Sequence, residues 1–158
     1  MRDPHAARQL PHLPMGAHER RAGVQLMKFL VVDDAATMRR IVINSLQRIQ
    51  SPMIGSVEIC EAEDGVQALG IFRAGGIDFV LSDWNMPNMT GLELARAIRE
   101  LPTGGDVPIL MVTTRASQED ILAAVQARVN NYVLKPFTPQ VLKEKIELVL
   151  SQRSAEAA

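Results

Sequence analysis

Histidine is absent from most of this chain. The 158 residues contain three histidines, and all of them lie within the first 18 positions (His5, His12 and His18). Their spacing matches no metal-ligand pattern. Residues 19–158 therefore cannot form a Ser-His-Asp triad, a histidine general acid–base pair or a histidine-ligated zinc site.

Cysteine, long apolar runs and net charge are also scarce. Cys60 is the single cysteine, which excludes an internal disulfide and suits a reducing, cytoplasmic location. It lies in the apolar stretch SVEIC, so we expect a buried structural thiol. No apolar run approaches the roughly 18 residues of a membrane span. A net charge of −1 gives no electrostatic case for nucleic-acid binding.

The first 26 residues differ from the rest of the chain. They hold prolines at positions 4, 11 and 14, show little periodicity and have no apolar region typical of a secretory signal. We interpret residues 1–26 as a disordered extension, or as an over-called start upstream of Met27. We expect one domain over residues 27–152 and a short tail over 153–158.

From Met27 onward, short apolar segments alternate with segments of helical periodicity. The predicted strands are 28–32, 56–60, 77–82, 107–113 and 131–134, and the predicted helices are 36–50, 64–76, 90–101, 118–129 and 138–152. Thr90 and Glu93 form a capping-box pattern, and Thr138 precedes Pro139 as an N-cap. This alternation predicts an α/β fold, a single doubly wound domain whose parallel sheet is covered on both faces.

Polar side chains follow the predicted strands. Asp33 and Asp34 come after the first strand, Asp83 after the third, Thr113 after the fourth and Lys135 after the fifth. In such folds, ligands bind at the carboxyl ends of the strands, where the strand order reverses. If the first and third strands are neighbours, three carboxylates converge there.

Three adjacent carboxylates repel one another unless a cation lies among them. Their oxygen atoms favour a hard cation such as Mg²⁺ or Mn²⁺, which can also bridge to a phosphate. A lysine and a threonine hydroxyl can contact phosphoryl oxygens. The set suits phosphoryl transfer to a carboxylate, with Asp83 as nucleophile. The simpler interpretation is that Asp33 and Asp34 only cap the helix that begins near Ala36.

The chain resembles the receiver domains of bacterial two-component response regulators, the CheY-type single-domain chemotaxis regulators in particular. The resemblance covers residues 27–152 and rests on KFLVVDD, TMRRIV, EAEDG, ALGIFRAGGIDFVLSDWNMPNMTGLEL, PILMVT and NYVLKPF. It implies a flavodoxin-like, five-stranded (βα)5 sheet of order 2-1-3-4-5. It also implies that Asp83 accepts the phosphoryl group, and that Mg²⁺ is held by Asp33, Asp34, Asp83 and the backbone carbonyl of Asn85.

The resemblance implies further roles along the same edge. Thr113 and Lys135 would contact the phosphoryl group, and Lys135–Pro136 would be a cis peptide. Tyr132 would be the aromatic side chain that changes rotamer on activation. Trp84, next to Asp83, would report metal and phosphate binding by its fluorescence.

The chain also departs from the family pattern. Thr114 and Arg115 follow the switch threonine and are expected to tune access to the phosphate and its lifetime. The segment RIQSPMIGS is longer than usual, which should lengthen a loop opposite the site. In ARVNNY, Asn130 and Asn131 are expected to supply left-handed backbone geometry in place of glycine. The pair Arg39-Arg40 is either a solvated helix face or a partner contact.

The predicted function is a chemotaxis response regulator. A sensor histidine kinase would phosphorylate it, a phosphatase could act on it, and as a monomer it would bind the flagellar motor switch protein. The alternative is a phosphorelay shuttle or phosphate sink that passes its phosphate to a histidine phosphotransferase. A haloacid-dehalogenase-type phosphatase is disfavoured because Asn85 stands where a second aspartate is needed. DDAAT also lacks the glycines of an FMN phosphate loop. We therefore expect a regulator that assists its own phosphorylation and hydrolysis, and no conventional enzyme.

Overall fold

The computed structural model describes residues 25–157, so the predicted extension up to residue 24 lies outside the described residues. Five strands alternate with five helices along the chain. In order they are β1 Leu26–Val32, α1 Ala36–Arg48, β2 Ser56–Ala62, α2 Gly65–Arg73, β3 Phe79–Ser82, α3 Gly91–Glu100, β4 Ile109–Thr113, α4 Gln118–Gln126, β5 Asn131–Leu134 and α5 Pro139–Ala157. Every predicted element is present, with ends that differ by a few residues.

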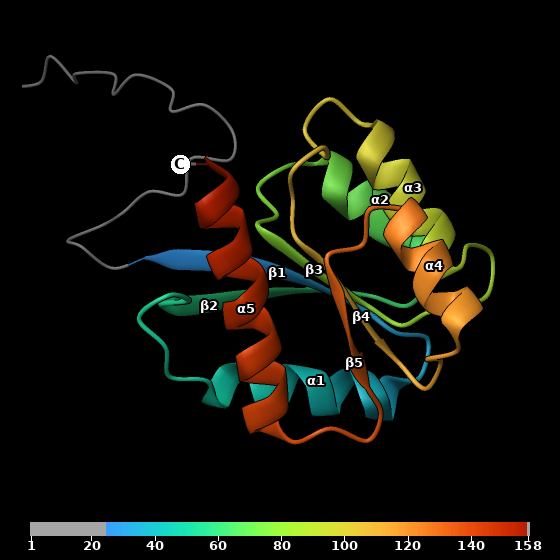
Figure 1. Cartoon of the computed structure of the whole chain (residues 1–158). Helices are drawn as coiled ribbons and strands as arrows, with labels where there is room; N and C mark the ends of the chain where they lie inside the picture. The colour runs from blue at the N-terminus through green and yellow to red at the C-terminus, as the bar shows by residue number, and fades with distance from the viewer. Residues whose placement is uncertain (1–24, 158) are drawn as a thin grey trace, which may run out of the picture.

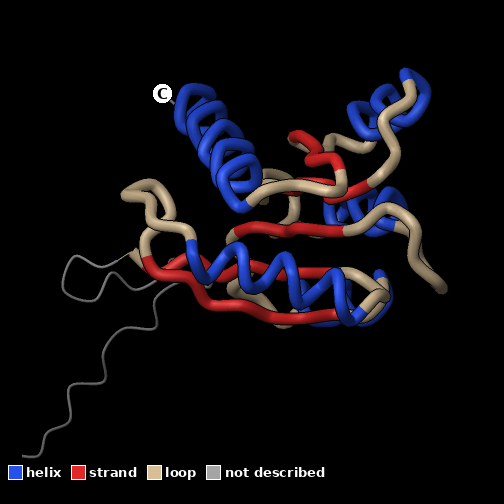
Figure 2. Tube along the Cα trace, turned by 90° about the horizontal axis from the view of Figure 1, so that it is seen from below, coloured by secondary structure: helices blue, strands red, loops and turns tan. Residues whose placement is uncertain are grey.

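The strands form one parallel sheet of order β2-β1-β3-β4-β5, which confirms the expected fold. Figure 2 shows the strands in red and the helices in blue. The chain leaves β1 for one edge at β2 and then returns to the other side of β1 at β3. The order therefore reverses at the β1–β3 pair, and the carboxyl ends of these two strands flank the reversal.

Two apolar layers enclose the sheet. Helices α1 and α5 cover one face, and α2, α3 and α4 cover the other (Figure 1). Alternate residues of β1 serve the two layers: Phe29 packs toward α1 and α5, whereas Leu30 packs toward α2 to α4. The ring centroids of Phe29 and Phe79 lie 5.2 Å apart.

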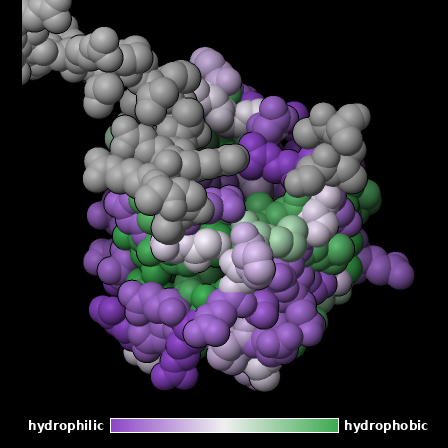
Figure 3. Space-filling model, turned by 90° about the vertical axis from the view of Figure 1, so that its left-hand side faces the viewer, coloured by the Kyte–Doolittle hydropathy of each residue, from purple (hydrophilic) through white to green (hydrophobic). Residues whose placement is uncertain are grey.

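On the molecular surface, apolar and polar areas are interspersed on the face that Figure 3 shows. No described helix is long and apolar enough to cross a membrane.

The predicted helix starts are confirmed. Thr90 and Glu93 form a complete capping box at α3, and the Thr138 hydroxyl accepts a hydrogen bond from Val141 N at 3.2 Å in α5. The capping interpretation of the aspartate pair is wrong. The N-cap of α1 is Ala35, which makes no side-chain cap bond, and the Asp33 side chain accepts from the N–H of Ala35 itself and not from an N–H inside the helix.

The first strand and the last helix extend past residues 27 and 152, the ends of the predicted domain. Strand β1 begins at Leu26, one residue before the predicted boundary, and Met27 is buried within it. Helix α5 continues to Ala157, through most of the segment expected to be a tail. Cys60 is only partly buried, because β2 is an edge strand.

The α4–β5 turn also differs from expectation. The left-handed residue is Arg128, with φ of 58°, and neither Asn130 nor Asn131 has a positive φ. The Asn130 side chain acts as an acceptor instead: its Oδ1 receives hydrogen bonds from Ile109 N at 2.7 Å and from Arg99 at 3.0 Å. The amide therefore fixes the start of β4 to the turn.

The longer loop between α1 and β2 is part of the packed structure. Ile54 is fully buried in the layer of α1 and α5. Ser51 Oγ donates to Glu147 Oε2 of α5 at 2.8 Å. The insertion is therefore anchored to the last helix.

Gly91, the first residue of α3, packs closely against the backbone that follows β3, and a substitution there tests this packing. A Cβ at this position would lie 2.1 Å from the carbonyl oxygen of Asp83. We expect Gly91→Ala to lower the free energy of unfolding by about 2 kcal/mol or more, measured by urea denaturation. Gly70→Ala is the matched control, because a Cβ there meets open space. It should raise stability by about 0.5–1 kcal/mol, as helix propensity predicts. Equal effects of the two changes would contradict this packing.

Candidate functional site

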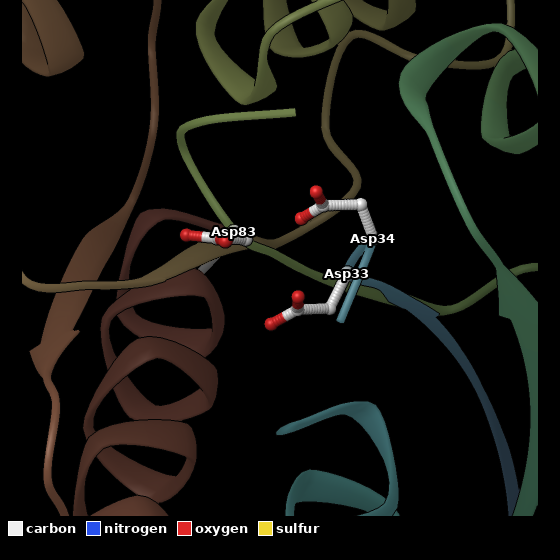
Figure 4. Close-up of side chains that lie close together, drawn as sticks. All are labelled: Asp33, Asp34 and Asp83. Atoms are coloured by element: carbon white, nitrogen blue, oxygen red, sulfur yellow. The ribbon is translucent and has the colours of Figure 1, made fainter. Parts of the chain in front are cut away.

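The candidate site lies where β1 and β3 end side by side. Val32 pairs with Ser82, and Asp83 N donates to Val32 O at 2.9 Å, so Asp33 and Asp83 follow neighbouring strand ends. The carboxyl groups of Asp33, Asp34 and Asp83 lie close together (Figure 4), each offering an oxygen within 4.8 Å of the others. The sheet topology thus brings together the three predicted carboxylates.

Asp33 and Lys135 form the buried side of this group. Asp33 is 2% exposed. Its Oδ1 accepts from Ala35 N at 2.9 Å, and its Oδ2 accepts from Lys135 Nζ at 3.1 Å. The same ammonium group lies 3.4 Å from Asp83 Oδ2. Lys135 is positioned by its backbone N, which donates to Thr113 O at 2.9 Å, and it precedes a cis bond to Pro136 as expected.

The surroundings of Asp83 disfavour its ionised form. Burial is the largest cause of a raised pKa, and the negative charge of Asp33 raises the pKa further. The positive charge of Lys135 opposes this shift, as does the Trp84 N–H, which donates to Asp83 Oδ1 at 2.7 Å. One lysine thus does not fully offset the carboxylates. An all-oxygen donor set with residual negative charge fits a hard divalent cation.

The remaining predicted residues lie on β4, on β5 and on the loops that follow β3 and β4. Thr113 is buried at the end of β4 and pairs with Leu134, the residue before Lys135. Asn85 and Thr114 are exposed on the loops after β3 and β4. Tyr132 lies on β5 and packs against the apolar layer of α2, α3 and α4. It is partly buried two residues before Leu134, with Lys145 Nζ 5.4 Å from its ring centroid.

Comparison with known proteins identifies the family. A family model described as the response regulator receiver domain matches residues 29–147. The chain belongs to this family. The chemotaxis protein CheY homolog of Campylobacter jejuni is 47% identical over 133 residues, which cover 84% of this chain and 98% of the relative. The chemotaxis protein CheY of Pseudomonas aeruginosa is 48% identical over 126 residues, covering 80% and 98%.

Solved structures agree with this assignment. The chemotaxis protein CheY4 of Vibrio cholerae is similar with a TM-score of 0.72 and 33% identity, covering 79% of this chain and 99% of that one. The chain is therefore a CheY-type chemotaxis response regulator, a signalling protein and not a classical enzyme, and the phosphorelay alternative is not favoured.

Arg115 connects the loop that follows β4 to the loop that follows β3. Its guanidinium donates to Asn85 Oδ1 at 3.1 Å and to Asp120 Oδ1 at 2.8 Å, and it lies 4.9 Å from the Trp84 ring centroid. The bond from Arg115 is the main cause of a lowered Asp120 pKa. The sequence indicated that Arg115 and Asn85 flank the phosphate site, but it gave no sign that Arg115 donates to Asn85 and to Asp120.

Arg39 lies in a different environment from the one expected. We expected a solvated or partner-binding side chain, yet it is 13% exposed and turned inward. It donates to the backbone carbonyl of Asp33 at 2.7 Å and to Glu61 Oε1 at 3.0 Å. Arg40, the other half of the pair, is exposed. One feature of the sequence could have indicated this contact: Arg39 lies in the first turn of the helix that follows the Asp33-Asp34 pair.

Replacing the Asp83 charge should stabilise the receiver domain in the absence of divalent cations. A carboxyl group with a raised pKa binds its proton more tightly in the folded state, so its ionisation costs stability as the pH rises through that pKa. We expect Asp83→Asn to raise Tm at pH 7 by a few degrees, since 1 kcal/mol corresponds to roughly 3 °C at this chain length. Calorimetry in EDTA measures it, and the gain should shrink as the pH is lowered through the Asp83 pKa. A lower Tm for the variant at pH 7 would contradict it.

Proposed function

We propose that Asp83 accepts a phosphoryl group from the phosphohistidine of a sensor histidine kinase, and that the phosphorylated form binds the flagellar motor switch protein. The convergence of three carboxylates with Lys135 at the sheet reversal carries this proposal. The similarity to relatives that are named chemotaxis proteins supports binding to the flagellar motor switch protein as the output.

The carboxylates of Asp33, Asp34 and Asp83 and the carbonyl of Asn85 would hold Mg²⁺. When bound, this ion supplies positive charge that offsets the carboxylates and the phosphoryl oxygens. The protein's own part is to hold these oxygens in place: Asp33 through Ala35 N and Lys135, and Asp83 through Trp84 N.

In the proposed transfer, one Asp83 carboxylate oxygen forms a bond to phosphorus as the phosphorus–nitrogen bond of the donor breaks. The electron pair of that bond stays on the imidazole nitrogen, and the imidazole leaves neutral if its other nitrogen carries a proton. Lys135, already 3.4 Å from Asp83, and the Thr113 hydroxyl then contact phosphoryl oxygens. Hydrolysis reverses the change: water attacks phosphorus, inorganic phosphate leaves, and the Asp83 carboxylate is regenerated.

Output would pass through the surface of α4, β5 and α5. Leu122 and Val125 of α4 are 57% and 62% exposed, and Leu134 and Val141 add further apolar area. Exposed apolar side chains that cluster on neighbouring elements are typical of a protein-binding surface. Movement of Thr113 and Tyr132 toward the site would shift this surface between two populated states.

The decisive experiment follows phosphorylation and partner binding in the same samples. We expect acetyl phosphate with Mg²⁺ to quench Trp84 fluorescence and to produce a protein that binds purified motor switch protein. Asp83→Asn should abolish both responses while retaining the fold. Val66→Ala is the matched surface control, because Val66 is exposed on α2, outside the carboxylate group and outside the proposed output surface of α4, β5 and α5. It should still be phosphorylated.

Two failures of this experiment have different meanings. Absence of phosphorylation in the wild type would exclude Asp83 as a phosphoryl acceptor. Normal phosphorylation without increased affinity for the motor switch protein would exclude the proposed output alone.

Arg115 and Thr114 are proposed to set the lifetime of the aspartyl phosphate. The Arg115 guanidinium lies across Trp84 and is bonded to Asn85 on the loop that follows Asp83. This limits the approach of water, so we expect Arg115→Ala to speed dephosphorylation several-fold. Loss of radiolabelled phosphate measures this directly, without relying on Trp84, whose emission the substitution itself would alter. Glu119→Ala, an exposed change in the same region, is the control, and an unchanged rate for Arg115→Ala would refute the role.

A further inference from the structure

The first turn of α1 contains a charge that helix electrostatics disfavours. The backbone N–H groups at a helix N-terminus give that end a partial positive charge, which favours acidic side chains there. The first turn of α1 holds no acidic residue. It holds Arg39 instead, whose backbone N makes a bond to the carbonyl of the N-cap Ala35. A cation at this position therefore needs a compensating partner.

The partner is the backbone of the aspartate pair. Pairing between β1 and β2 ends at Val32 and Ala62, so the carbonyl of Asp33 lies beyond the last pair of the ladder. Arg39 Nη1 donates to this carbonyl at 2.7 Å. Because Asp33 is almost fully buried, leaving its carbonyl without a donor would cost about 1–3 kcal/mol.

Glu61 fixes the guanidinium from the other side. Its Oε1 accepts from Arg39 Nε at 3.0 Å, and Glu61 belongs to β2, the strand that pairs with β1. Arg39 thus connects α1, the end of β1 and β2 through two different nitrogen atoms. A planar guanidinium can make both bonds at once, whereas the ammonium of lysine cannot reproduce that fixed geometry.

These contacts define the path of the chain through Asp33. Its N–H donates to Ala62 O at 3.2 Å, its carbonyl accepts from Arg39, and its side chain is bonded to Ala35 N and Lys135. Asp34 follows directly, with an exposed side chain. The orientation of the Asp34 carboxylate therefore depends on a backbone that Arg39 holds.

We propose that Arg39, anchored by Glu61, is a positioning residue that sets the geometry of the Asp33-Asp34 pair for divalent-cation binding. This inference rests on the proposed function of the same site. It assigns Arg39 to the interior of the domain, as a support for the carboxylates and not as a partner contact.

The test compares Mg²⁺ affinity with stability. Trp84 fluorescence gives the Mg²⁺ Kd, and urea denaturation without Mg²⁺ gives the unfolding midpoint. We expect Arg39→Gln to raise Kd about 10-fold, the range found when outer contacts of metal ligands are removed. Arg39→Lys should lie between Arg39→Gln and the wild type. Arg40→Gln is the matched control on the same helical turn and should leave Kd unchanged.

Glu61→Gln provides a second route if Arg39→Gln does not fold. It should weaken Mg²⁺ binding by a smaller factor, and adding it to Arg39→Lys should weaken binding by less than the product of the separate effects, because both changes disturb one contact. Such a pattern would support the positioning role even without data for Arg39→Gln.

Three results would overturn the inference. A wild-type Kd in Arg39→Gln with a lowered unfolding midpoint would make Arg39 purely structural. An equal loss of affinity in Arg40→Gln would reduce the effect to net charge. Absence of Mg²⁺ binding in the wild type would overturn both this inference and the proposed function, whereas either of the first two results would overturn this inference alone.

Discussion

The ammonium group of Lys135 is the charge on which the functional edge depends. It lies 3.1 Å from Asp33 and 3.4 Å from Asp83, and its side chain is only 12% exposed. Partly buried carboxylates this close repel one another strongly without a cation nearby. Lys135 follows β5, which reaches the β1–β3 reversal only through β4. The ammonium group of Lys135 therefore reaches the two carboxylates only when β3, β4 and β5 are paired in the sheet, so the charge balance of the site depends on the complete sheet.

Ionisation of Asp83 is disfavoured in the folded domain, and the burial of the two apolar layers offsets this cost. The raised pKa of Asp83 means that its surroundings penalise the charge that the proposed chemistry needs. Phe29, Leu30 and their neighbours on both sides of the sheet are fully buried, and they hold the strand ends in register despite this penalty. Because a cation or a phosphoryl group changes the same charge balance, ligand binding and domain stability are coupled.

Local patterns in the sequence were sufficient to predict whether each element is a helix or a strand, and to predict that carboxylates follow the strand ends. The alternation of apolar segments, the capping box at Thr90 and the polar residues after each strand all depend on near neighbours in sequence. What failed depends on distant partners. Arg39 donates to the carbonyl of Asp33 and to Glu61, and the Asn130 side chain accepts from Ile109 N and Arg99, whereas the left-handed residue of that turn is Arg128. The resemblance, not periodicity, supplied the strand order.

The hydrogen bonds of Thr113 explain how one buried hydroxyl could serve two states. Its oxygen accepts from Arg115 N at 3.0 Å, so the hydroxyl proton remains available as a donor. In the proposed phosphorylated state, donation from this hydroxyl to a phosphoryl oxygen would therefore not require the loss of the bond that holds the β4–α4 loop. Arg115 in turn is bonded to Asp120 in the first turn of α4. A displacement of Thr113 would thus be transmitted through Arg115 to α4, which carries the exposed Leu122 and Val125, by contacts that already exist in this state.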